Sequence, residues 1–419
     1  MDFPANTGLY SGIGLCAAAG LRCAGAAMQW WTARRRERRE FLASLQEFED
    51  QLDACRPPPA PSHVAWKGYR RFVVQRIVAE ADDIRSIYLA PEDRRGLPAF
   101  RPGQFLTLRL TVPGMAAPLV RCYSLSDRPR ADHYRITVKA IHRDPELDHS
   151  KGKASRFLNR GVRPGDVLEA QAPRGEFFLR EGDARAAVLV AAGIGITPLL
   201  SMTSALLNEP GERAVVLFYG VRNSNEHAFR ERLRDLAAEE PRFTYFPCYS
   251  QPLPADEQPR DYLAATRVDA EMLRRVLPDA NFPFYVCGPG PFMQGIVDGL
   301  REWGVADADL HYEAFGPSTV KRHTAALTEA VPAAVTANVQ FQQSNIAADG
   351  SSDSTLLELA ETAGVNLSSG CRAGNCGTCA IKLLAGKVRY NDPPAALIDP
   401  GFCLACVARP DSPQVVLDA

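Results

Sequence analysis

Three cysteines near the C-terminus, Cys371, Cys376 and Cys379, form a C-x4-C-x2-C pattern within the segment SSGCRAGNCGTCAIKL. This is the spacing at which thiolates hold a [2Fe–2S] cluster, with a fourth cysteine further along the chain. Gly374 and Gly377 allow a tight loop whose backbone approaches the cluster sulfurs without a Cβ clash. The pattern therefore predicts a one-electron iron–sulfur centre.

The fourth ligand is either Cys403 or Cys406, both in the segment GFCLACVARP. Residues three apart in a strand point to opposite sides, so only one of the two should face the cluster. The residues alone leave both candidates open.

A second group of residues fits a flavin. In the run RCYSLS, strand alternation places Arg121 and Tyr123 on one face, which offers a cation to a pyrophosphate and a ring to a flavin. The same residues could form an ordinary strand edge before a turn. Their position ahead of an α/β segment favours the flavin interpretation. Downstream, GKAS (152–155) opens a helix-like segment, and such an N-terminus suits a phosphate.

Two glycine turns follow buried apolar strands, where open α/β sheets bind ligands. In GIGITP (193–198), Thr197 is expected to be the N-cap and Pro198 the first helical residue. The second turn is CGPGPFM, which begins at Cys287. A nucleophilic role for Cys287 lacks support because no histidine accompanies it.

The elements that position these motifs fall into successive patterns. Residues 68–180 alternate apolar and polar positions in about six short runs, which predicts a small antiparallel barrel. From about 184 to 318, apolar strands alternate with helical segments, which predicts a parallel sheet. We expect five regions: an N-terminal extension with a Pro-rich linker, a barrel, an α/β domain, a linker and a cysteine-rich domain, at 1–62, 63–180, 181–318, 319–334 and 335–419.

Residues 8–31 are rich in Ala and Gly, and the basic run RRRERR follows them. Length and flanking arginines suit a membrane helix with its basic end in the cytoplasm. Arg22 inside the stretch argues against one, because a central arginine costs about 2.5–3.5 kcal/mol on insertion scales. A helical anchor, a peripheral helix and a leader segment all remain open. The clustered cysteines favour a reducing compartment, so we expect a cytoplasmic protein, either unattached or held at the inner face of a membrane.

Together these motifs resemble the ferredoxin-NADP reductase superfamily, and in particular the three-domain reductases of multicomponent oxygenases. The barrel and α/β halves are also similar to the reductase part of flavohaemoglobins (RCYSLSD, AAGIGITPLLSM, YGVRN, HYEAFGP). The resemblance implies a multidomain fold with an antiparallel flavin barrel, a parallel nucleotide-binding sheet and an α+β ferredoxin domain of the β-grasp type, after a helical N-terminal extension.

The same resemblance implies roles for individual residues. Tyr123, Ser124 and Cys287 would lie at the reacting rings. Nucleotide or flavin would also be bound by Arg121, Val138, Lys139, Gly152, Lys153, Ala154, Ser155, Gly193, Gly195, Thr197, Pro198, Arg222, Gly288, Pro289, Glu313 and Phe315. Among the cysteines, the ferredoxin pattern selects Cys406 as the fourth cluster ligand and leaves Cys403 as a buried thiol.

We therefore expect FAD, with FMN as the alternative, a [2Fe–2S] cluster, and either NADH or NADPH. Arg222 could meet a 2′-phosphate, no acidic residue follows it directly, and the flavohaemoglobin-like context favours NADH. The expected function is electron delivery to a separate oxygenase or hydroxylase protein. The alternatives are a self-sufficient reductase of small acceptors and a redox-sensing binding module. A net charge of −1, from 48 basic and 49 acidic residues, does not favour nucleic acid as a partner.

Overall fold

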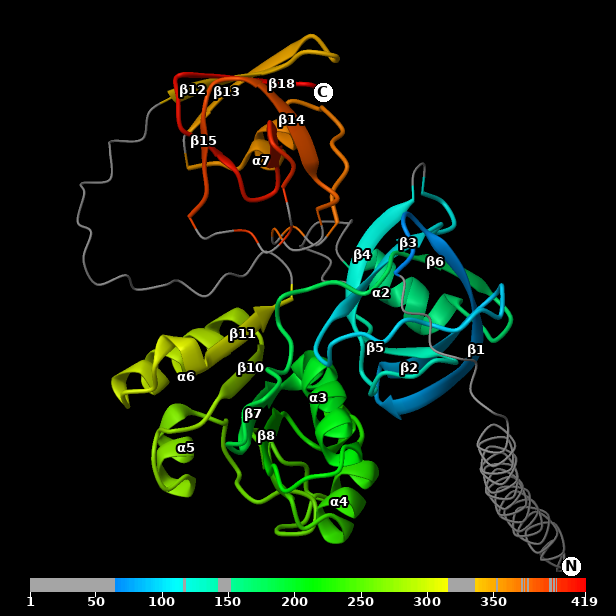
Figure 1. Cartoon of the computed structure of the whole chain (residues 1–419), viewed down its shortest axis with the longest axis vertical. Helices are drawn as coiled ribbons and strands as arrows, with labels where there is room; N and C mark the ends of the chain where they lie inside the picture. Colours follow the sequence, from blue (N-terminus) through cyan, green and yellow to red (C-terminus); the bar gives the residue numbers. More distant parts are fainter. Residues whose placement is uncertain are drawn as a thin grey trace, which may run out of the picture. The chain divides into compact units, whose positions relative to one another are not determined.

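The computed structural model describes residues 65–115, 118–141, 152–315, 336–351, 353–370, 372, 374, 377–391, 394, 396 and 398–419. The expected N-terminal extension, the 319–334 linker, Cys371 and Cys376 lie outside these residues. Figure 1 shows the described elements, coloured along the chain.

The first described part is an antiparallel sheet of six strands in the order β4-β3-β6-β1-β2-β5. Its strands are β1 (Arg70–Ala81), β2 (Ile84–Pro91), β3 (Phe105–Leu110), β4 (Leu119–Ser124), β5 (Tyr134–Lys139) and β6 (Val167–Ala170). A bridge between Leu125 and Ile136 joins the ends of β4 and β5, so the sheet closes into a barrel. Helix α2 (Lys153–Arg156) continues into a π-helical turn, η1 (Phe157–Gly161).

The second part is a parallel sheet in the order β11-β10-β7-β8-β9. Its strands are β7 (Ala187–Ala192), β8 (Val215–Val221), β9 (Phe243–Tyr249), β10 (Phe284–Gly288) and β11 (Leu310–Ala314). Its helices are α3 (Ile196–Asn208), α4 (Arg230–Glu239), α5 (Ala270–Val276) and α6 (Gly290–Glu302), with short 3-10 turns η2 (Gly193–Gly195), η3 (Ser224–Glu226) and η4 (Asp307–Asp309).

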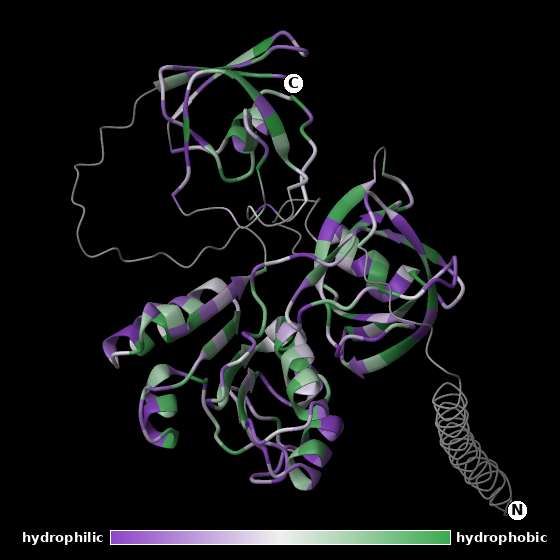
Figure 2. Cartoon of the chain, in the orientation of Figure 1, coloured by the Kyte–Doolittle hydropathy of each residue, from purple (hydrophilic) through white to green (hydrophobic). Residues whose placement is uncertain are grey.

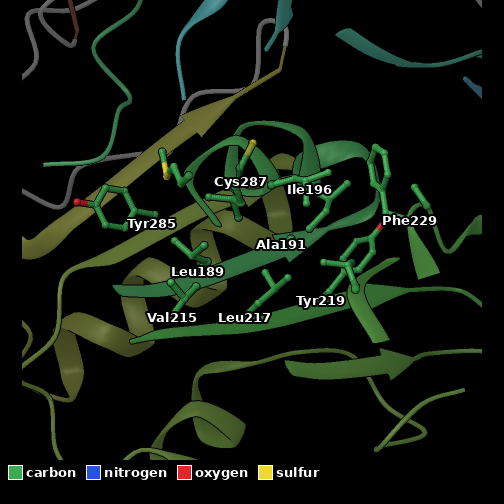
Figure 3. Packing of buried hydrophobic residues seen from close by; sticks show 14 of the residues in the cluster. Leu189, Ala191, Ile196, Val215, Leu217, Tyr219, Phe229, Tyr285 and Cys287 are labelled. Carbon is green, nitrogen blue, oxygen red and sulfur yellow. The ribbon is translucent and has the colours of Figure 1, made fainter. Parts of the chain in front are cut away.

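Helices cover both faces of this sheet, which explains why its strands are continuously apolar. Side chains of α3 and α4 pack with one strand face in one hydrophobic cluster, and those of α5 and α6 pack with the other face in a second. Figure 3 shows the first cluster, where Leu189, Ala191, Leu217 and Cys287 gather near Ile196 at the start of α3. Helix α6 alternates hydrophobic and hydrophilic residues around its axis, as a helix with one packed face should (Figure 2).

The C-terminal part is a mixed sheet in the order β13-β12-β18-β14-β16, in which β12 and β18 are parallel and the other pairs antiparallel. Its strands are β12 (Thr336–Phe341), β13 (Ile346–Ser351), β14 (Ala380–Ala385), β16 (Phe402–Leu404) and β18 (Gln414–Leu417), beside a small ladder of β15 (Val388–Arg389) and β17 (Arg409–Pro410). Helix α7 (Leu356–Thr362) begins with a capping box between Thr355 and Glu358.

The expected fold class is confirmed: an antiparallel flavin-type barrel, a parallel nucleotide-type sheet and a mixed ferredoxin-type sheet follow one another along the chain. The exact domain limits given above stay predictions. Within the described ranges no helix has the length and apolar character needed to cross a bilayer, and residues 8–31 fall outside those ranges.

One local expectation is wrong. Helix α3 begins at Ile196 with Gly195 as its N-cap, so Thr197 is the second helical residue and Pro198 the third. The 3-10 turn at 193–195 starts the winding earlier, and the hydroxyl of Thr197 donates to the carbonyl of Ile194 at 3.1 Å instead of capping. Proline is tolerated there because the first-turn N–H groups have no partner inside the helix.

Candidate functional site

Strand β4 carries the predicted flavin residues along the edge of the barrel sheet. It pairs with β3, so that Tyr123 lies opposite Leu106 and Ser124 opposite Phe105. Arg121 and Tyr123 are half-buried, and the Arg121 guanidinium donates to the carbonyl of Val120 at 2.7 Å. Loss of solvent around the phenol raises the pKa of Tyr123, so this ring stays neutral.

Among the described residues, two of the predicted flavin residues each have a buried side-chain atom without a hydrogen-bond partner. They are the hydroxyl oxygen of Ser124, whose residue is 5% exposed, and the Oε2 atom of Glu313, whose residue is 8% exposed. Buried polar atoms are almost always satisfied, so each of these two atoms has room for a partner. Ser124 and Glu313 therefore fit a bound cofactor that offers hydrogen-bonding groups, as a flavin ring does.

The predicted phosphate seat begins at Gly152, which has a φ of +74° and caps α2. The Ser155 hydroxyl is used internally, donating to the carbonyl of Gly152 at 3.1 Å and accepting from the amide of Ile141 at 3.2 Å. Ala154 is buried. Lys153 instead lines a surface hollow of 540 Å³ with Arg156 and with Arg160, which is paired with Asp83 at 2.7 Å. Lys153 and Arg156 suit a pyrophosphate. The residues lining the hollow are Val112, Pro113, Gly114, Met115, Lys153, Arg156, Phe157, Arg160 and Gly161.

The two predicted residues of β5 have different surroundings. The side chain of Val138 is 2% exposed and belongs to the barrel core. The ammonium of Lys139 forms an ion pair of 3.0 Å with Glu226, which follows β8 in the nucleotide-type sheet. Lys139 therefore connects the flavin barrel to the nucleotide side.

The two glycine turns meet at one edge of the parallel sheet. Strands β7 and β10 are hydrogen-bonded neighbours with Ala191 opposite Cys287, so their carboxyl ends are adjacent. A Cβ on Gly195 would overlap the carbonyl oxygen of Cys287, which shows how closely the turns approach. Gly193 has a φ of +55°, a conformation that favours glycine. Gly288 and Pro289 lead directly into α6, so the N-termini of α3 and α6 share this edge, where a diphosphate fits.

Cys287 and Glu313 are neighbours across β10 and β11. Burial, and then the nearby Glu313 carboxyl, raise the pKa of Cys287 well above its usual value, so it is a protonated thiol rather than a nucleophile. Burial also raises the pKa of Glu313 to about 8, so this side chain is mostly neutral at pH 7. Phe315 follows two residues later and is 41% exposed, a large apolar side chain open to a ligand.

Sequence reasoning missed Glu226 at the end of β8. Its Oε1 atom accepts a hydrogen bond from Arg222, the residue predicted to meet a 2′-phosphate, and its Oε2 accepts from Lys139. Burial alone would raise the pKa of Glu226, but the hydrogen bonds from the two cations outweigh it and hold the pKa below its ordinary value. The R-x-x-x-E spacing within 222–226 was the available signal.

In the C-terminal sheet, the thiol sulfurs of Cys379 and Cys406 are 3.1 Å apart, further than a disulfide bond and close enough to share a metal. Both residues are buried, at 4% and 7% exposure. Cys403 is 0% exposed and lies in β16 opposite Ile381. Gly374 and Gly377 have φ values of +73° and +71°, as a tight loop requires. The close pair of Cys379 and Cys406 fits part of an iron–sulfur cluster site, and the other two predicted ligands, Cys371 and Cys376, lie outside the described residues.

Two family models match the chain. Residues 189–298 match an oxidoreductase NAD-binding domain, and residues 339–411 match a 2Fe-2S iron-sulfur cluster binding domain. The two matches coincide with the parallel sheet that carries the glycine turns and with the mixed sheet that carries the paired cysteines.

Relatives and solved structures match the same parts. A flavohemoprotein from Halalkalibacterium halodurans is 38% identical over 253 residues, which is 60% of this chain and 61% of that protein. The chain thus spans about three fifths of the length of the curated relatives it matches. The flavohem-like FAD/NAD binding domain of nitric oxide dioxygenase from Vibrio cholerae O1 biovar El Tor is 33% identical, with a TM-score of 0.51, over 59% of this chain and 99% of that one.

Phthalate dioxygenase reductase extends the likeness through the cluster domain. It is 25% identical, with a TM-score of 0.53, over 84% of this chain and 98% of that chain. Fold, site and matches together define an NAD(P)H-dependent oxidoreductase of the ferredoxin-reductase type. The chain belongs to the FAD/NAD reductases of this type that carry a C-terminal [2Fe–2S] ferredoxin domain. FAD, NAD(P)H and a [2Fe–2S] cluster are the cofactors that this family implies.

Proposed function

We propose that this protein is the reductase component of a multicomponent oxygenase or hydroxylase. It takes hydride from a nicotinamide nucleotide and delivers single electrons, through its [2Fe–2S] domain, to a separate oxygenase or hydroxylase protein. The likeness to phthalate dioxygenase reductase, over nearly the whole length of that chain, supports a reductase that is separate from its oxygenase here. We further propose that the reaction takes place in the cytoplasm, with residues 8–31 as the segment that would hold the protein at a membrane.

The observation that carries this proposal is the pair of buried cysteine sulfurs, 3.1 Å apart, in a sheet that follows a reductase fold. A reductase of small acceptors needs only the flavin and the nucleotide. A one-electron centre in the same chain suits an acceptor that takes electrons singly through a protein contact, which for redox partners is usually small and transient.

Bound FAD supplies the conversion of a two-electron hydride into single electrons. The chain's residues position and shield it. Ser124 and Glu313 would satisfy their orphaned atoms on the flavin, and Tyr123 would pack against its ring. Because Glu313 is mostly protonated at neutral pH, it adds little negative charge beside the path of the hydride. Phosphates would be held by Arg121 and Lys153 on the flavin side and by the glycine turns on the nucleotide side.

The test compares wild type with Cys406→Ser and with the matched control Cys403→Ser, all as full-length protein. We expect Cys406→Ser to keep NADH-dependent reduction of ferricyanide, which accepts electrons from the flavin. Its reduction of cytochrome c, a protein acceptor of single electrons, should fall on the order of tenfold or more. Cys403→Ser should keep both activities. If Cys406→Ser reduces cytochrome c as fast as wild type, the cluster is not on the electron path and the self-sufficient reductase is the better account.

A further inference from the structure

The segment that follows the flavin strand leaves the barrel and contacts the nucleotide sheet. Three residues after Ser124, the backbone carbonyl of Asp127 accepts a hydrogen bond of 2.6 Å from the hydroxyl of Ser201 on helix α3. Ser201 is fully buried and Asp127 is 7% exposed. Seventy-four residues separate the two, so this is a contact between the two folded parts.

The side chain of Asp127 lies among arginines, including Arg130 at 3.7 Å. The carboxylate of Asp127 lies 3.9 Å from Arg135 of strand β5 and 4.0 Å from Arg232 of helix α4. The guanidinium of Arg135, which is 2% exposed, also lies 5.3 Å from the ring centre of Phe229, the residue just before α4. These five residues form what we call the clamp: Asp127, Arg135, Ser201, Phe229 and Arg232. It ties the barrel to two helices of the nucleotide sheet.

The Ser201 hydroxyl bonds outside its own helix, unlike the hydroxyl of Thr203 on the same helix. Two residues further along the same helix, the hydroxyl of Thr203 donates to the carbonyl of Leu199 at 2.8 Å, which is the usual bond of a buried helical hydroxyl. Ser201 donates instead to a carbonyl of the barrel. Its neighbour Met202 also reaches the barrel, because a Cβ on Gly103 would lie only 2.6 Å from the Met202 methyl carbon.

Ser201 lies close in sequence to the predicted nucleotide seat, and Asp127 lies close in sequence to the predicted flavin strand. Helix α3 begins directly after the 193–195 glycine turn, and Ser201 lies five residues into it, which is about 7.5 Å along the axis. On the other side, only two residues separate Asp127 from Ser124, one of the predicted flavin contacts. A single stiff path therefore joins the nucleotide seat to the flavin strand. Displacements of about 1 Å between reacting groups can cost on the order of a hundredfold in rate.

We propose that the clamp is a positioning device, in which the Ser201–Asp127 hydrogen bond sets the distance between the nicotinamide and the flavin for hydride transfer. The proposal rests on the proposed function, since it concerns the same reaction. Ser201, Asp127 and Arg135 act through the elements they hold and not by touching the reacting atoms.

The test uses full-length holoprotein and compares Ser201→Ala with Thr203→Val, which removes a buried hydroxyl of the same helix without touching the barrel. Flavin reduction is followed by stopped flow with NADH and with NADH deuterated at the transferred position. We expect Ser201→Ala to slow reduction on the order of tenfold, to enlarge the isotope effect and to weaken the long-wavelength charge-transfer absorbance. Thr203→Val should leave all three unchanged. Arg232→Gln, at a half-exposed position, should shift them in the same direction as Ser201→Ala by a smaller factor.

Amide hydrogen exchange provides a measurement that does not depend on turnover. Ser201→Ala should increase exchange at residues 126–128 and at the 193–195 turn, whereas Thr203→Val should not affect residues 126–128. The proposal is overturned if exchange at both places is unchanged in Ser201→Ala, or if the two variants slow reduction equally and in proportion to their loss of melting temperature. Failure of wild type to accept electrons from NADH or NADPH would instead refute the proposed function, and the exchange comparison would still decide the clamp.

Discussion

Glu226 lies between two cations at the end of strand β8, where it accepts hydrogen bonds from Arg222 and Lys139. In sheets of this kind the ribose of the nucleotide lies beyond the second strand, next to the glycine turn. Gly220 of β8 is paired with Ala192, the residue before that turn. Arg222 and Glu226 therefore follow β8 at the end of the sheet where the ribose is expected. The Glu226 carboxylate already pairs with Arg222, the cation that the 2′-phosphate of NADPH would need. This pairing favours NADH.

Replacing Glu226 by Gln should therefore raise the ratio of kcat/KM for NADPH to that for NADH. We expect a change on the order of tenfold, or about 1.4 kcal/mol, which is a modest value for one charge contact near a protein surface. Steady-state kinetics with both nucleotides measure it. Glu231→Gln is the matched control, because Glu231 pairs with arginines on the exposed side of α4 and should leave the ratio unchanged. An unchanged ratio in Glu226→Gln would show that this carboxylate does not select the nucleotide.

Glu313 predicts a pH effect on stability. Because burial raises its pKa from an ordinary value of 4.5 to about 8, the native protein binds this proton more tightly than the unfolded chain does. The free energy of unfolding should therefore fall as pH rises through this window. Glu313→Gln removes the titration, so its melting temperature should exceed that of wild type by a margin that grows from pH 5 to pH 8.5. The full difference is on the order of a few kcal/mol. Parallel melting profiles for the two proteins would contradict this account.

For individual residues, the sequence predicted those features that depend on neighbours in the chain. The cysteine spacing and the two loop glycines predicted a tight turn, and Gly374 and Gly377 adopt the left-handed conformation it needs. The pairing of Lys139 with Glu226 and the raised pKa of Glu313 depend on burial and on neighbours distant in the chain. No local pattern encodes them.

Among the elements, the two glycine turns approach each other very closely. Gly195 has an ordinary helical φ of −60°, so its backbone conformation does not require glycine. The lack of space does, because an added Cβ would overlap Cys287 of strand β10. Gly195→Ala should push α3 and β10 apart. We expect a loss of about 1–3 kcal/mol in the free energy of unfolding, as for other overpacked sites, and a raised KM for NADH with normal flavin content.

Gly295→Ala is the control for that experiment. Gly295 lies inside α6, and nothing lies within 4 Å of the position its Cβ would take. Alanine should therefore be neutral or stabilising by up to about 1 kcal/mol. Denaturant unfolding and NADH kinetics separate the two variants. Equal effects of both substitutions would mean that crowding at the turns is not the cause.

The order and type of the elements could be predicted because strand and helix periods differ, and because both glycine turns follow apolar runs. The exact start of α3 could not. Thr197 followed by Pro198 is a good cap signal, yet the 3-10 turn at 193–195 begins the winding before it. A tertiary constraint, the packing of Gly195 on β10, overrides the local preference there.

For the whole molecule, three sheets in one chain correspond to three steps: hydride donation, storage on the flavin and one-electron export. The kinds of motif, and not their order along the chain, predicted these steps. They could not predict the clamp, because Ser201 and Asp127 belong to different folded parts and neither lies in a recognisable pattern. The coupling between the parts is visible only in the structure.

The central claim, that electrons pass from NADH through the flavin to the cluster, is tested most directly by one experiment. The purified full-length protein is titrated anaerobically with NADH and followed by absorbance and low-temperature EPR. The account predicts that the flavin band bleaches and that a rhombic signal of a reduced [2Fe–2S] cluster appears, the signal being lost in Cys406→Ser. A bleached flavin with an EPR-silent cluster in wild type would contradict it.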